Sequence, residues 1–245
     1  MAHALRISRD ELLLKRLDDP EPAAFDPLLA RRLAHEPIAY ITGSRAFWTI
    51  ELEVGPGVLV PRPDSETLIE AAVEYFKQYE PRRILDLGTG PGTLLLAALT
   101  QWPEAEGLGV DASETALTYA RRNAEALGVG DRAEYRLGDW SAGIDTQFDL
   151  ILANPPYIGT GEQLPPDVRE YEPAEALFAG PDGLDDYRRI LPDIPRLLAP
   201  GGVALFEIGS TQADAVSALA RQHGLVPTVI RDLRGLSRVV SMVEM

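Results

Sequence analysis

Residues 83–92 read Arg83-Ile84-Leu85-Asp86-Leu87-Gly88-Thr89-Gly90-Pro91-Gly92, and this stretch decides the fold. Its first half is a mostly apolar run of strand length, and its second half is a glycine-rich turn. Glycine lets the backbone turn sharply and approach a ligand closely, as happens after the first strand of nucleotide-binding folds. A dinucleotide fingerprint would need glycine at position 93, where this chain has Thr93, so the spacing is G-x-G-x-G instead. The motif alone leaves a second interpretation open, a tight strand–helix turn that binds no ligand.

Strand-like and helix-like segments alternate from residue 82 to the end of the chain. Such alternation predicts a mainly parallel sheet covered by helices on both faces, with ligands bound at the carboxyl ends of the strands. The fold class is therefore α/β, a doubly wound sheet of seven strands whose last two form an antiparallel edge. The predicted strands are residues 83–87, 107–110, 133–137, 148–153, 202–208, 228–231 and 238–243, and the predicted helices are residues 92–101, 113–127, 184–198 and 211–223.

Two smaller segments precede this domain, which we assign to residues 64–245. Residues 1–40 are predicted to be helical, with a capping box that begins at Ser8. Residues 41–63 are predicted to form a β-hairpin linker with its turn at Gly55-Pro56-Gly57.

A long segment without a helix or strand pattern is expected late in the domain. Residues 158–181 are rich in glycine, proline and acidic residues. Loops of this length in compact domains are often lids or binding segments, and we predict such a role here.

Composition excludes several classes of protein. The 38 acidic and 23 basic residues give a net charge of −15, which repels the phosphates of nucleic acids. The chain has no cysteine and only three scattered histidines, so no metal site is expected. Its longest unbroken apolar run, Leu94–Leu99, is too short to span a membrane, and the charged segment after Met1 leads us to expect no signal peptide. We therefore expect a soluble cytoplasmic protein.

Acidic residues end the second and third strands of the predicted sheet. Asp111 follows the second strand, where a carboxylate commonly holds ribose hydroxyls, although it could instead cap the next helix, as could Ser113. Asp139 and Trp140 end the third strand. The carboxylate could accept a hydrogen bond from an adenine amino group and the indole could cover the adenine face, whereas packing in the core is the alternative for Trp140.

The fourth strand ends in Asn154-Pro155-Pro156-Tyr157. The prolines hold Asn154 and Pro155 extended, so the Asn154 side-chain oxygen and the Pro155 carbonyl are presented as two fixed acceptors. Two acceptors aimed at the N–H groups of a planar nitrogen would turn its delocalised lone pair toward an electrophile, and the ring of Tyr157 could lie against the planar group. The alternative is an Asn-Pro turn that only ends a strand.

Together these elements resemble the class I methyltransferases that use S-adenosylmethionine. The resemblance implies that the glycine loop receives the methionine part of the cofactor, that Asp111 binds ribose and that the end of the third strand flanks adenine. The cofactor-binding residues that it implies are Gly88, Thr89, Gly90, Pro91, Gly92, Asp111, Asp139, Trp140 and Asn154. The Asn-Pro-Pro-Tyr sequence is similar to the branch that methylates adenine or cytosine amino groups or glutamine amides.

Five further segments resemble the release factor glutamine methyltransferases. They are residues 36–43, Phe47-Trp48, residues 59–66, Tyr171-Glu172-Pro173 and Phe206-Glu207-Ile208-Gly209. The resemblance implies N5-methylation of the glutamine in the Gly-Gly-Gln loop of class 1 peptide chain release factors, with S-adenosylhomocysteine as the second product. The residues that it implies for catalysis and substrate binding are Asn154, Pro155, Pro156 and Tyr157, with Arg62 added to the substrate site. Glu207 is expected either to orient the amino group of the cofactor or to lie in solvent.

The resemblance leaves two other functions open, and this chain departs from the family pattern in two respects. The alternatives are a DNA or RNA amino methyltransferase, which would need a basic surface, and a cofactor-binding partner of the translation apparatus without catalysis. Family members carry a longer amino-terminal helical domain that helps to grip the release factor, and we expect this chain to enter partway through it. Pro91 replaces a small polar residue and removes one N–H donor from the glycine loop. We expect a monomer that contacts neither nucleic acid nor membrane.

Overall fold

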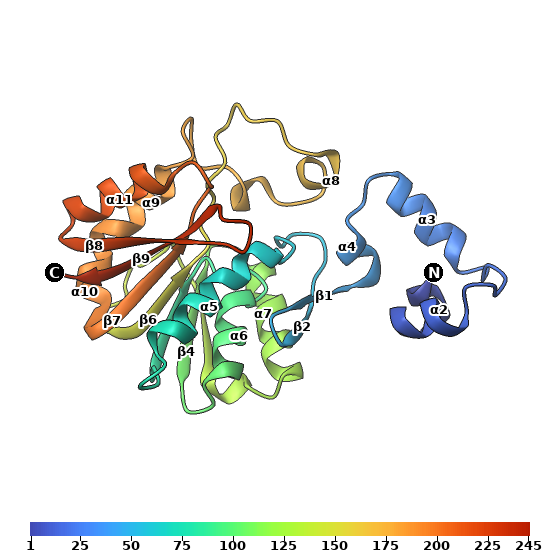
Figure 1. Ribbon diagram of the computed structural model, residues 1–245, viewed down its shortest axis with the longest axis horizontal. Helices are drawn as coiled ribbons and strands as arrows, with labels where there is room; N and C mark the ends of the chain where they lie inside the picture. Colours follow the sequence, from blue (N-terminus) through green and yellow to red (C-terminus); the bar gives the residue numbers. More distant parts are fainter.

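The computed structural model describes residues 1–245, and seven of its strands form one sheet in the order β5-β4-β3-β6-β7-β9-β8 (Figure 1). Strands β3 to β7 are parallel, and β9 runs antiparallel to both β7 and β8, so the predicted fold class and its antiparallel edge are confirmed. The chain moves outward from β3 through β4 to β5 and then returns to the other side of β3 with β6. This reversal opens a crevice at the carboxyl ends of β3 and β6. The strands are β3 Arg83–Leu87, β4 Glu106–Asp111, β5 Ala133–Leu137, β6 Phe148–Ala153, β7 Leu198–Glu207, β8 Leu225–Arg231 and β9 Ser237–Glu244.

Helices cover both faces of the sheet because successive strand residues point to opposite sides. Ile84 and Leu152 face the first layer, whereas Leu85 and Ile151 face the second. The first layer contains α5 Glu66–Tyr75, α6 Thr93–Gln101 and α7 Glu114–Ala126, and the second contains α9 Asp185–Ile190, α10 Ile194–Leu197 and α11 Ala213–Gln222. The prediction of one continuous α-helix over residues 184–198 is wrong. The 3₁₀ turn η4 Leu191–Asp193 separates α9 from α10. This turn contains Pro192, which has no backbone N–H to donate.

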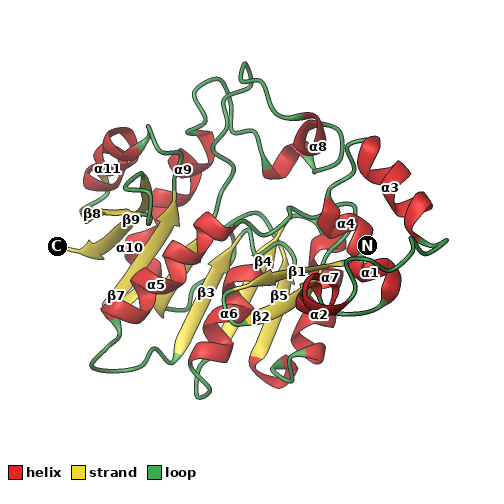
Figure 2. Cartoon of the chain, turned by 45° about the vertical axis from the view of Figure 1, so that its right-hand side comes forward, coloured by secondary structure: helices red, strands yellow, loops and turns green.

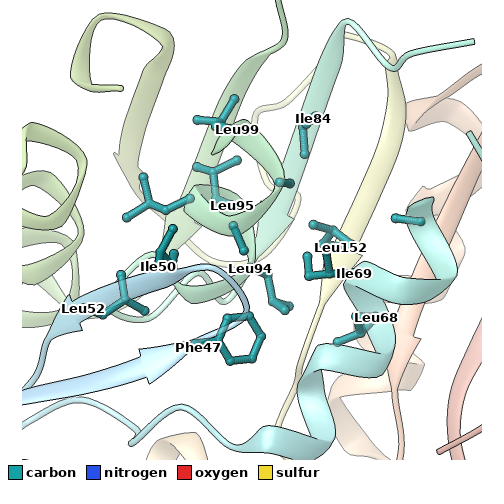
Figure 3. Packing of buried hydrophobic residues seen from close by; sticks show 14 of the residues in the cluster. Phe47, Ile50, Leu52, Leu68, Ile69, Ile84, Leu94, Leu95, Leu99 and Leu152 are labelled. Atoms are coloured by element: carbon teal, nitrogen blue, oxygen red, sulfur yellow. The ribbon is translucent and has the colours of Figure 1, made fainter. Parts of the chain in front are cut away.

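A separate two-stranded hairpin packs on the first helical layer. It pairs β1 Ser44–Phe47 with β2 Ile50–Glu53, so the turn lies at Trp48 and Thr49 and the predicted turn at Gly55-Pro56-Gly57 is wrong. Trp48 takes a left-handed φ of 52°, and its N–H donates to Glu66 at 2.9 Å, which compensates a conformation that its own side chain disfavours. Phe47, Ile50 and Leu52 insert among leucines of α5 and α6 (Figure 3).

The first three helices lie at the side of the molecule opposite the C-terminus and bury no residue of their own (Figure 1 and Figure 2). They are α1 Ala2–Leu5, α2 Arg9–Lys15 and α3 Phe25–Leu33. The capping box is present in part, because Ser8 accepts the N–H of Glu11 at 3.0 Å. Helix α4 Ile38–Thr42 then leads into β1 and buries Ala39 and Tyr40. The division of the chain near residues 40 and 63 stays a prediction.

The remaining elements are short. They are η1 Pro63–Ser65 before α5, η2 Gly130–Arg132 before β5, and α8 Pro166–Arg169 with η3 Ala174–Ala176 inside the long loop. None of the helices has both the length and the apolar character that crossing a membrane would require.

Candidate active site

A cavity of about 650 Å³ lies at the carboxyl ends of the central strands. This volume is typical of sites for small organic ligands. The residues that line it come from the glycine loop, from the ends of β4, β5 and β6, from residues 57–65 and from the long loop. Of the predicted site residues, those on the cavity wall are Arg62, Gly88, Thr89, Gly90, Pro91, Asp111, Asp139, Trp140, Asn154 and Pro156.

The glycine loop needs glycine for its backbone shape. Gly88, Gly90 and Gly92 have φ values of 73°, 56° and 88°, a region that side chains rarely tolerate. A Cβ atom on Gly90 would meet nothing within 4 Å, so its backbone borders open space in the cavity. Gly92 ends the turn just before the first residue of α6 and is not on the cavity wall. Asn123 holds the loop from behind by donating to the Pro91 carbonyl at 2.9 Å.

Asp86 is a cavity residue that our sequence analysis did not assign to the site. Its Oδ2 accepts from the Thr89 hydroxyl at 2.7 Å and from the Leu95 N–H at 3.2 Å, whereas its Oδ1 is buried without a partner. Burial raises the pKa of Asp86 to about 7, and the two hydrogen bonds that its Oδ2 accepts oppose this rise. A cation that enters this end of the cavity would find an unused acceptor there. The only signal in the sequence was an acidic residue inside an apolar strand, three residues before a hydroxyl.

Replacing Asp86 with asparagine should make stability less dependent on pH. The folded pKa is raised above its ordinary value, so the contribution of this group to stability is present in acid and is lost as pH rises through about 7. The unfolding free energy of Asp86→Asn minus that of the wild type should therefore increase between about pH 5 and about pH 8, by roughly 3 kcal/mol. Urea unfolding at both pH values measures it. A difference that does not change with pH would show that Asp86 titrates normally.

Asp111 supports both the glycine loop and the next helix. Its carboxylate accepts from the Gly90 N–H at 2.8 Å and from the Ser113 N–H at 2.9 Å. Ser113 is the residue that caps α7, since its hydroxyl accepts the Ala116 N–H at 3.2 Å. Burial raises the pKa of Asp111, and the hydrogen bonds from Ser113 and Gly90 oppose that shift. Each carboxylate oxygen can accept two hydrogen bonds, so Asp111 keeps lone pairs for further donors.

The residues that follow β5 form another part of the cavity wall. Trp140 has a left-handed φ of 49°, lines the cavity and also packs against the core, so both predicted roles are compatible with its position. Its indole N–H donates to Asp186 at 3.2 Å. Asp139 lines the cavity as predicted, but both of its oxygens already contact Arg189 at 2.6 Å.

The four residues after β6 are divided between the cavity and the core. Asn154 and Pro156 line the cavity, whereas Pro155 is buried and neither it nor Tyr157 lies on the cavity wall. The Tyr157 ring packs against the hydrophobic core between the sheet and the second helical layer, and its hydroxyl lies 3.5 Å from Oε1 of Glu207. The expected contact between the Tyr157 ring and a planar substrate group stays a prediction.

Glu207 does not lie in solvent, which was one of its two expected positions. It is only 1% exposed, so that alternative is wrong, whereas a role in orienting the amino group of the cofactor stays a prediction. Burial raises the pKa of Glu207 to about 7, and the Ser65 hydroxyl opposes the shift.

The long loop is fastened to the cavity wall by an ion pair between a buried carboxylate and a partly exposed arginine. Glu172 accepts from Arg62 at 2.5 Å with one oxygen and from the Val60 N–H at 3.0 Å with the other. Pro173, next in sequence, lines the cavity, and Tyr171 donates to the Ala34 carbonyl at 2.6 Å. The loop thus connects the cavity to the amino-terminal helices.

Comparison with known proteins agrees with this geometry. Residues 80–230 match a family described as a methyltransferase domain, and residues 1–43 match the PrmC N-terminal domain. The release factor glutamine methyltransferase of Caulobacter vibrioides is 42% identical over 97% of this chain and 84% of its own length. The corresponding protein of Cereibacter sphaeroides is 45% identical over 98% of this chain and 87% of its own. Among solved structures, the Thermus thermophilus 16S rRNA N2 G1207 methyltransferase with AdoMet and guanosine has a TM-score of 0.61 and 21% identity, over 82% of this chain and 50% of that one.

The sheet order, the glycine loop and the cavity define a class I methyltransferase that depends on S-adenosylmethionine. The likeness to the ribosomal RNA enzyme concerns the fold alone. Because relatives above 40% identity align along most of their own length, the chain belongs to the release factor glutamine methyltransferases.

Proposed function

We propose that this protein transfers the methyl group of S-adenosylmethionine to the side-chain nitrogen of the glutamine in the Gly-Gly-Gln loop of class 1 release factors. The observation that carries the proposal is that Asn154 borders the same cavity as the glycine loop. The names of relatives that match nearly the whole chain support the choice of acceptor.

The cavity has features that fit the proposed cofactor. The open backbone at Gly90 leaves room for the methionine part, and the free Oδ1 of Asp86 is an acceptor for its ammonium group. The lone pairs of Asp111 suit the ribose hydroxyls, and the indole of Trp140 suits the adenine ring. When bound, the cofactor supplies an electrophilic methyl group on a sulfonium centre.

The role proposed for Asn154 and Pro155 is to orient a poor nucleophile. A glutamine amide donates its two N–H groups to the Asn154 side-chain oxygen and to the Pro155 carbonyl, and its lone pair then faces the methyl carbon. The Pro155 carbonyl must become accessible as the substrate binds, because Pro155 is not on the cavity wall. As the nitrogen–carbon bond forms, the carbon–sulfur bond breaks and sulfur keeps its electron pair. The nitrogen then loses a proton to water, so no strong base is required. Positioning of this kind is worth roughly 7–11 kcal/mol of the barrier.

The charge of the chain supports a protein acceptor. A net charge of −15 repels nucleic acid and favours a basic partner. We further propose that the enzyme acts as a monomer in the cytoplasm, where release factors work, with Arg62 and Pro156 on the substrate side of the cavity.

Methyl transfer from radiolabelled cofactor to a purified release factor tests the proposal. Label should appear on the release factor and not on its Gly-Gly-Ala variant, and nucleic acid should stay unlabelled. Equal labelling of the variant would exclude the assigned glutamine. Label on DNA or RNA would favour an amino methyltransferase of nucleic acids, and cofactor binding without transfer would favour a non-catalytic partner.

A further inference from the structure

The side chain of Asn154 can point in two ways, and only one of them suits the proposed chemistry. An asparagine amide has an acceptor oxygen at one end and a donor NH₂ group at the other. If the amide were turned round, an NH₂ group would face the N–H groups of the substrate glutamine, and donors would oppose donors. Something in the protein must therefore fix the orientation of this amide.

Ser65 contacts the donor end of the amide. Asn154 Nδ2 donates to the Ser65 hydroxyl oxygen at 3.3 Å, which leaves Oδ1 as the end available to the cavity that Asn154 lines. Ser65 ends the η1 turn at the start of α5 and is only 2% exposed, so water cannot easily replace this contact.

The Ser65 oxygen has the lone pairs that this contact needs. A hydroxyl oxygen can accept two hydrogen bonds, and Ser65 accepts the one that Asn154 donates. Glu207 is also buried in this region, but its Oε2 has no hydrogen-bond partner and its Oε1 lies 3.5 Å from the Tyr157 hydroxyl. Ser65 is therefore the residue that contacts the donor end of the Asn154 amide.

We propose that Ser65 is a positioning residue that holds the Asn154 amide with its oxygen toward the substrate. The inference rests on the proposed function for its purpose, but the orientation itself belongs to the protein without substrate. Ser65 does not touch the reacting atoms and acts through Asn154.

The sequence offers a direct way to observe this amide. The chain contains only two asparagines, Asn123 and Asn154, so protein labelled with ¹⁵N-asparagine gives two side-chain NH₂ signals in an NMR spectrum. The signal that disappears in Asn154→Asp assigns the pair. Asn123 is an internal control, because its amide is bonded to Glu53 and Pro91 and not to Ser65.

Ser65→Ala should increase solvent exchange of the Asn154 NH₂ protons by about tenfold or more, the effect of losing one hydrogen bond, with the Asn123 signal unchanged. If the Asn154 signal keeps its shift and exchange rate in Ser65→Ala, the inference is wrong, whatever reaction the enzyme catalyses.

A kinetic comparison separates positioning from general support of the fold. Ser65→Ala should lower kcat for methyl transfer to the release factor by about ten- to a hundredfold while the cofactor Kd stays the same. In an Asn154→Asp background, Ser65→Ala should lower kcat by less than about threefold. A carboxylate has an acceptor oxygen at both ends, so it presents an acceptor to the substrate in either orientation. Equal losses in both backgrounds would overturn the inference. A wild-type enzyme that transfers no methyl to glutamine would refute the proposed function, and the NMR result would still decide on the amide.

Discussion

Replacing Asn154 with alanine should lower kcat by about a thousandfold or more and leave the cofactor Kd within about threefold of the wild type. Asn154 borders the cavity at the end of β6, across the switch point from the glycine loop that ends β3. Its oxygen is the only side-chain acceptor that the proposal places on the substrate nitrogen. Without it, the glutamine amide can bind in many orientations, and few of them aim the lone pair at the methyl carbon. Single-turnover transfer and calorimetric titration with the cofactor measure the two quantities.

Asn154→Asp is the matched control for this variant. It keeps an acceptor of the same size, so it should retain far more activity than Asn154→Ala, within about tenfold of the wild type. If alanine weakens cofactor binding as much as it slows turnover, Asn154 supports the cavity instead of the acceptor. If alanine retains near-normal kcat, the role proposed for the Asn-Pro-Pro-Tyr sequence is refuted.

The sheet was predictable because its signals are local. Runs such as residues 148–153 lie between two helical layers and are apolar on both sides, so the printed sequence alone marks them as buried strands. The hairpin turn was not predictable in this way. Gly55-Pro56-Gly57 has the composition of a turn, whereas the actual turn uses Trp48, which is held by Glu66 from α5. A contact between residues 18 positions apart overrode the local preference.

The candidate site was predictable where one motif follows one strand. The glycine loop, Asp111 and Asn154 each end a strand of a parallel sheet, and the topology therefore brings them to one edge. The partners that hold these residues come from distant parts of the chain. Ser65 lies 89 positions from Asn154, and Glu172 lies 110 positions from Arg62, so no spacing rule could have paired them.

Replacing Asp111 with alanine should have the converse effect to Asn154→Ala. We expect the cofactor Kd to rise by about a hundredfold or more, since hydrogen bonds to a charged group contribute roughly 1.5–3 kcal/mol each. The variant loses the acceptor for the Gly90 N–H, which shapes the glycine loop, together with the lone pairs proposed for the ribose hydroxyls. At saturating cofactor, kcat should remain within about tenfold of the wild type, because Asn154 is untouched. Calorimetric titration and initial rates at high cofactor concentration separate the two effects.

The fold itself should tolerate this change, because the Ser113 hydroxyl still caps α7 after Asp111 is removed. The free energy of unfolding should fall by no more than about 2 kcal/mol, the cost typical of a lost cap or hydrogen bond. Asp111→Asn, which keeps one acceptor oxygen, should raise the cofactor Kd by an intermediate factor of about ten. If Asp111→Ala binds cofactor as well as the wild type, Asp111 serves only the loop and the helix. If its stability collapses together with binding, the loss of affinity reports unfolding, and the ribose assignment must be abandoned. Opposite outcomes for Asp111→Ala and Asn154→Ala would mean that the two ends of one cavity have separate tasks, binding at β4 and orientation at β6.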